Sequence, residues 1–201
     1  MAVTPTRWHR HLAAVLAAAC ACTAINAVSG AAQAAAKDVS GAAQAAAEDK
    51  APHKARLTSE QRAVLRAATR RFRDVKVAVA AGYLPTKDCV PGMGFHYTKP
   101  RLAGDMNIDP TRPEVLVYTP AAGGKVRLGA LEYFRADDDG KIRTHKDRPT
   151  LFGHRFDGPM AGHPLPAGQP PMPVHYDLHV WLYLSNPDGQ LAPDNPRVKC
   201  G

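Results

Sequence analysis

The stretch that most constrains this fold is a run of strand-forming residues near the C-terminus, Val174 to Pro187, which reads V-H-Y-D-L-H-V-W-L-Y-L-S-N-P. Side chains of a strand point alternately to opposite faces of a sheet. One face of this strand is therefore apolar and consists of Tyr176, Leu178, Val180, Leu182 and Leu184. The other face consists of His175, Asp177, His179, Trp181 and Tyr183. The sequence thus predicts a strand that presents three groups capable of chemistry on one side.

Two further strands are predicted at 113–119 and 125–134, joined as a hairpin by a loop that contains two glycines. Strict alternation in the second strand places Glu132 on the same face as Leu128, Ala130 and Phe134. A buried carboxylate is costly unless it is paired or bound to a cation. Glu132 is therefore a candidate site residue. The alternative is a structural role, paired with an arginine or held by hydrogen bonds.

An N-terminal helix is predicted to begin at Thr58, because Gln61 follows it by three residues as in a capping box. Apolar residues then recur at three- and four-residue spacing as one stripe, up to a helix end at Gly82: Val64, Ala68, Phe72, Val75 and Val79. One helix followed by alternating strands predicts an α+β domain over residues 57–201, with the helix packed on a curled antiparallel β-sheet of four to six strands.

The segment before this domain is typical of an exported protein. Residues 1–34 combine a basic start with a short apolar, Ala-rich run, which predicts a signal peptide and a secreted chain. Residues 35–56 predict a flexible spacer that contains part of an 11-residue tandem repeat (28–49). A lipoprotein anchor at Cys20 or Cys22 is disfavoured because Ala, not Leu, stands three residues before each. No transmembrane segment is predicted after cleavage.

Signal removal leaves two cysteines, Cys89 and Cys200. Two cysteines in an exported chain favour a disulfide, which would tie the start of the domain to its penultimate residue. The alternative is a pair of free thiols.

The formal net charge is +8, and basic residues are densest between Arg62 and Lys76. Either this run is a solvated helix face, or it attracts an anionic polymer such as cell-wall phosphate or nucleic acid. No nucleic-acid motif accompanies it. The predicted partner is therefore an unidentified small molecule or an envelope component, and no specific nucleic acid.

The candidate metal ligands are His96, which follows a Gly-Met-Gly turn, together with Glu132, His175 and His179. Imidazole and carboxylate are the ligands of zinc, copper, iron or manganese in sites without thiolate, and zinc or copper is the predicted cofactor. His175 and His179 lie about 13 Å apart along a regular strand, too far for one ion. Asp177 lies about 7 Å from either histidine and could share a site with one of them.

The sequence thus predicts an exported metal-binding protein or metalloenzyme, and three alternatives to it stay open. A metal-free hydrolase or lyase would use Glu132, His175 and Asp177 as its catalytic groups. A non-catalytic envelope protein would bind a partner, and a satisfied polar network would have no chemistry at all. Glu132 also lies on the apolar side of its strand, whereas the His175 series lies on the less apolar side of its own. The two can meet only if the sheet curls or a bulge changes the register.

Several segments together carry a resemblance to a known group: G-M-G-F-H-Y at 92–97, R-P-E-V-L-V-Y at 112–118, L-E-Y-F at 131–134, P-T-L-F-G at 149–153, H-Y-D-L-H-V-W at 175–181 and N-P-R-V-K-C at 195–200. In these motifs the chain resembles a family of uncharacterised secreted proteins of high-GC Gram-positive bacteria. The resemblance covers residues 57–201 and implies export and a compact domain. It assigns no activity and no catalytic residue.

Overall fold

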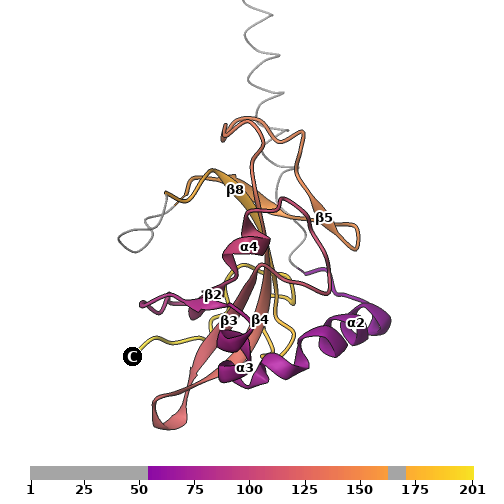
Figure 1. The fold of residues 1–201 in the computed structure, drawn as a ribbon. Helices are drawn as coiled ribbons and strands as arrows, with labels where there is room; N and C mark the ends of the chain where they lie inside the picture. The colour runs from indigo at the N-terminus through magenta and orange to yellow at the C-terminus, as the bar shows by residue number, and fades with distance from the viewer. Residues whose placement is uncertain (1–53, 163–170) are drawn as a thin grey trace, which may run out of the picture. The chain divides into compact units, whose positions relative to one another are not determined.

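A computed structural model describes residues 54–162 and 171–201 of the chain (Figure 1). The predicted signal peptide, the repeat and most of the spacer lie outside the described residues. The described part combines a few helices with an antiparallel sheet, as the predicted α+β class requires. None of its helices is long and apolar enough to cross a membrane.

The main sheet has six antiparallel strands in the order β1-β2-β3-β4-β8-β7. Their bounds are Leu84–Pro85 (β1), Phe95–Thr98 (β2), Val115–Ala121 (β3), Lys125–Ala136 (β4), Asp157–Met160 (β7) and His175–Val180 (β8). A short hairpin of Thr150–Leu151 (β5) and His154–Arg155 (β6) forms a separate two-stranded sheet. The predicted hairpin is confirmed as β3 and β4, which a 3-10 turn at Ala122–Gly124 (η2) connects. Curling of the sheet stays a prediction.

The N-terminal helical region is three segments rather than the one helix predicted. They are Ser59–Thr69 (α2), a 3-10 turn at Arg70–Arg73 (η1) and Val75–Ala80 (α3). The capping box of Thr58 and Gln61 is confirmed. The break comes at Asp74, whose backbone is extended and whose side chain accepts a hydrogen bond from the Lys76 N–H at 2.9 Å. Asp74 thereby caps a new helix. A further short helix, Pro100–Ala103 (α4), follows β2.

The predicted apolar stripe of the helix is correct only in part. Val64 and Val79 are 44% and 48% exposed, whereas Leu65, Phe72 and Ala78 are buried. For Val79, which follows the 3-10 turn, the reason is that the turn changes the rotation per residue and so shifts the buried face. In α2 the buried residues are Leu65 and Thr69 instead of Val64. The Thr69 hydroxyl donates a hydrogen bond to the Leu65 carbonyl at 2.6 Å, which removes the cost of burying a polar group that the apolar pattern had excluded.

The helical segments pack against one face of the sheet and form the larger core. Leu65 and Phe72 lie there in one cluster with Tyr118, Tyr133 and Leu178 from the three central strands. The tyrosine hydroxyls are satisfied by backbone, since Tyr118 donates to the Phe72 carbonyl at 2.5 Å and Tyr133 donates to the Pro110 carbonyl at 2.7 Å. None of the site residues predicted from the sequence belongs to this core.

The C-terminal segment contributes to the opposite face. Val198 packs there with Val117, Ala130 and Trp181 in a second, smaller core. The predicted disulfide between Cys89 and Cys200 is confirmed. Two backbone hydrogen bonds support the same arrangement, from the Gly92 N–H to the Val198 carbonyl at 3.2 Å and from the Asn195 N–H to the Gly92 carbonyl at 2.8 Å. The tail thus holds the turn that leads into β2.

A β-bulge at Gly129 decides which face Glu132 occupies. Val117 of β3 pairs with Ala130, but the next residue, Tyr118, pairs with Leu128, so that Gly129 has no partner of its own. The extra residue turns Leu128 toward the helices and leaves Ala130 and Glu132 on the opposite face. The prediction that Glu132 shares the face of Leu128 is therefore wrong. The change of register also removes the conflict between Glu132 and the strand of His179.

Candidate metal centre

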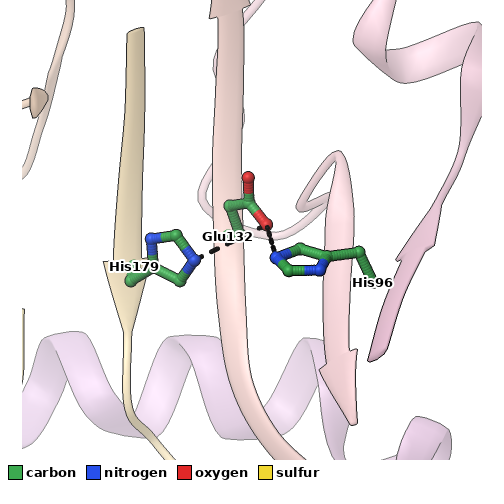
Figure 2. A group of neighbouring side chains, drawn as sticks. All are labelled: His96, Glu132 and His179. Carbon is green, nitrogen blue, oxygen red and sulfur yellow. Dashed lines mark ion pairs between the residues drawn. The ribbon is translucent and has the colours of Figure 1, made fainter. Parts of the chain in front are cut away.

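Three strands bring one side chain each to a common point: His96 from β2, Glu132 from β4 and His179 from β8 (Figure 2). Glu132 and His179 are direct partners across the β4–β8 pair. His96 lies beyond β3, opposite Val117, and its ring reaches Glu132 from the other side. Glu132 therefore lies between the two imidazoles, and both point toward it.

The distances between the three side chains suit a small cation. Glu132 Oε2 lies 3.4 Å from His96 Nε2 and 3.7 Å from His179 Nε2. One ligand atom from each residue lies within 4.8 Å of the other two. A tetrahedral ion with bonds of about 2.0–2.2 Å requires ligand atoms roughly 3.3–3.6 Å apart. Two edges of the triangle are near this value, and a small inward shift of the histidines would close the third.

Two members of the cluster, Glu132 and His179, are buried and have polar atoms without hydrogen bonds where an ion would sit. Glu132 is 7% exposed and His179 is 1% exposed. Within the described residues, Glu132 Oε2 and both ring nitrogens of His179 are buried without a hydrogen-bond partner. Buried polar atoms in proteins nearly always have such a partner. A bound cation would satisfy Glu132 Oε2 and His179 Nε2 together.

Without a metal ion, burial and neighbouring charges determine whether Glu132 and His179 carry a proton. Burial raises the pKa of Glu132 to about 7, although the positive charge of His179 opposes this shift. Burial lowers the pKa of His179, but the carboxylates of Glu132 and Asp177 outweigh it and raise that pKa to about 9. A proton on His179 is therefore stabilised by two acids. A metal ion would replace this proton as the compensating positive charge.

Asp177 supports the cluster from behind His179. Its Oδ1 lies 3.7 Å from His179 Nδ1, on the side of the ring away from Glu132. Burial raises the pKa of Asp177, but the neighbouring histidines, His179 first, lower it overall. A carboxylate that faces the far nitrogen of a metal-bound histidine fixes the tautomer and orients the ring. Asp177, predicted as catalytic, has the position of such an orienting group.

His175, predicted both as a ligand and as a catalytic group, does not belong to the three-residue cluster. It pairs with Ala136, four residues along β4 from Glu132. Its ring lies 5.0 Å from that of Phe134, and its Nδ1 lies 3.0 Å from the Pro173 carbonyl oxygen. The reason is the rise of a strand, which separates residues four positions apart by about 13 Å. Three of the four predicted ligands therefore converge, namely His96, Glu132 and His179.

Two features near the site were missed by reasoning from the sequence. Glu114 is a second buried glutamate, 1% exposed, and its Oε2 accepts a hydrogen bond from the Phe134 N–H at 3.1 Å. Its position just before β3 gives no pattern that would have distinguished it from a surface acid. The bulge at Gly129 did have a signal, because a glycine inside a strand often marks one.

The arrangement can bind one metal ion through two imidazole nitrogens and a carboxylate. Three protein ligands leave at least one coordination position for water or another small ligand, as in catalytic zinc sites. Comparison of the chain with protein-family models, with curated proteins and with solved structures found no match.

Proposed function

We propose that this chain is an exported protein that binds one divalent transition-metal ion through His96, Glu132 and His179. The observation that carries the proposal is the convergence of these three side chains from three strands on a buried point. Export is supported by the predicted signal peptide and by the disulfide between Cys89 and Cys200, because disulfides persist in oxidising compartments.

Zinc or copper is the proposed metal. A donor set of two imidazoles and one carboxylate, with no thiolate, suits zinc, and imidazole also suits copper. The same donors bind non-haem iron(II) when positions remain open, so iron(II) is the competing ion in the test. With zinc, the open position would hold a water of lowered pKa, which makes metal-assisted hydrolysis the proposed reaction class.

The direct test is metal analysis of the chain from residue 35 onward, purified without an affinity tag. We expect one equivalent of metal per chain, removable by a chelator and restored by titration with zinc or copper. Glu132→Gln keeps the size of the side chain and removes its charge. It should weaken metal binding by more than the roughly 10–100-fold that is typical when a residue that only orients a metal ligand is replaced.

The matched control is Glu114→Gln, which alters another buried glutamate in the same sheet region but outside the cluster. It should bind the metal as the wild type does. Circular dichroism of both variants would establish that each is folded. A chain that purifies without metal and shows no saturable binding of zinc, copper or anaerobic iron(II) would contradict the proposal. It would leave the metal-free use of Glu132 and His179 as the alternative.

A further inference from the structure

A pocket of about 360 Å³ lies away from the histidine cluster and is lined by three arginines, Arg66, Arg73 and Arg127, together with Leu128 and Tyr183. The arginines come from α2, η1 and β4, so the fold and not one run of sequence brings them together. No residue of this pocket belongs to the metal cluster.

Arg66 is held in place by residues 182 and 183 of the C-terminal segment. One of its terminal nitrogens donates a hydrogen bond to the Leu182 carbonyl at 2.6 Å, and its guanidinium lies over the ring of Tyr183, 5.2 Å from the centroid. The Tyr183 hydroxyl lies 2.9 Å from the Thr69 hydroxyl, which fixes the ring in turn. A guanidinium held in this way loses little freedom when it binds an anion.

The positive charge of the pocket has no acidic counterpart. Among residues 54–162 and 171–201, none of the three pocket arginines forms an ion pair with a carboxylate. Other arginines of the same chain do, since Arg112 pairs with Asp109 and Arg135 pairs with Asp138, each at 2.9 Å. The acid that follows Arg73 directly, Asp74, already accepts a hydrogen bond as a helix cap. The pocket is therefore electrostatically incomplete.

We propose that this pocket binds the phosphate group of a small phosphate monoester. Arginine forks match phosphate oxygens in pairs, which a less directional surface charge does not achieve. The side chains of Leu128 and Tyr183 give the pocket an apolar wall that can hold an organic substituent next to the phosphate. The volume is at the lower end of the range of small-molecule sites. A confined pocket suits one phosphate group better than a polymer, which needs a continuous basic track.

The test titrates the wild-type chain with inorganic phosphate and with glycerol 3-phosphate, using calorimetry and the arginine side-chain NMR signals. We expect saturable binding of one equivalent, with glycerol 3-phosphate tighter than inorganic phosphate. Arg73→Gln and Arg127→Gln should each weaken binding by roughly tenfold or more. Arg143→Gln removes the same charge from an exposed arginine that does not line the pocket, and should change binding by less than about twofold.

Three results would overturn the proposal. One is the absence of saturable binding of either probe. Another is equal weakening by Arg143→Gln, which would indicate only long-range attraction of a basic surface. The third is loss of phosphate binding in Glu132→Gln, because phosphate would then be a ligand of the metal centre. The proposal does not depend on the metal, so Glu132→Gln should bind glycerol 3-phosphate as the wild type does.

Discussion

His179 is the side chain on which the cluster depends most, because it lies between two carboxylates. Its Nε2 is 3.7 Å from Glu132 and its Nδ1 is 3.7 Å from Asp177. The ring of Trp181 lies nearly parallel to it, with centroids 6.5 Å apart. Packing and charge therefore fix the ring so that one nitrogen faces the proposed metal and the other faces an acid.

Asp177→Asn should weaken metal binding without changing its stoichiometry. The substitution removes the negative charge that orients His179 and increases the basicity of its metal-facing nitrogen, and such changes typically cost about 10–100-fold in affinity. A competition titration with a chromophoric chelator would measure it. Asp137→Asn alters an equally buried aspartate outside the cluster and should have no comparable effect. Equal losses in the two variants would argue against an orienting role.

Because Glu114 is buried, its ionisation should lower the free energy of unfolding of the protein as the pH rises. Burial raises the pKa of Glu114 to about 8 in the folded state, whereas in the unfolded state it is near the ordinary value of about 4.5. Between these two values the folded state holds a proton that the unfolded state has lost. The free energy of unfolding therefore falls with pH across this window.

Glu114→Gln should remove this pH dependence, because glutamine can still accept the hydrogen bond from the Phe134 N–H but never ionises. At pH 9 the variant should be more stable than the wild type by about 2–4 kcal/mol, and at pH 4 the two should differ little. Urea unfolding of both proteins at these pH values would measure the difference. A variant that is less stable at pH 9 would show that the carboxylate itself stabilises the fold.

Strand β4 is the element that builds the site, and Gly129 is the residue that gives it the correct register. A Cβ atom at Gly129 would lie 2.7 Å from Cγ2 of Thr119 and 3.5 Å from the ring of Trp181. Glycine is thus required by the close approach of β3 to the bulge. Any residue with a larger side chain must displace Thr119 or remove the bulge, which would turn Glu132 toward the wrong face.

Gly129→Ala should lower the free energy of unfolding by roughly 1–3 kcal/mol, the usual cost of overpacking a buried site. Thr119→Ser deletes the methyl group that the new Cβ would meet. In the double variant the cost should be smaller than the sum of the two single changes, which a double-mutant cycle by urea unfolding would reveal. Additive effects would mean that the clash is with the backbone or with Trp181 instead.

The sequence was enough to predict which kinds of residue form the site, but not how they are arranged in space. Alternation along β8 correctly placed Asp177 and His179 on one face, and the unusual acid in β4 indicated Glu132. The strand rise also predicted that His175 and His179 cannot share an ion. Two things depended on tertiary structure: the face of β4 on which Glu132 lies, which the bulge in the β3–β4 pairing sets, and the reach of His96 across β3. The helix break at Asp74 was missed because a continuous apolar pattern hid a local cap.

At the scale of the whole domain, the segment after β8, residues 181–201, has no helix or strand but packs on the sheet and is held to the rest of the domain. Val198 completes the second core, and Gly92 exchanges hydrogen bonds with the tail just before β2. The disulfide between Cys89 and Cys200 joins residues separated by 111 positions. It therefore ties the segment that leads to His96 to the end of the chain.

Cys89→Ser combined with Cys200→Ser should lower the free energy of unfolding, because the cross-link restricts the unfolded chain over a long loop. The chain-entropy model sets this loss at about 4–5 kcal/mol for a loop of this length, and measured values are often smaller. Metal stoichiometry should stay at one in the folded variant, since Glu132 and His179 are held by direct strand pairing that the disulfide does not make.

Urea unfolding of the double variant, compared with the oxidised wild type, gives the loss of stability, and metal titration gives the stoichiometry. Unchanged stability would show that the packing of Val198 alone holds the tail, whereas loss of the metal in a folded variant would show that the tail positions His96.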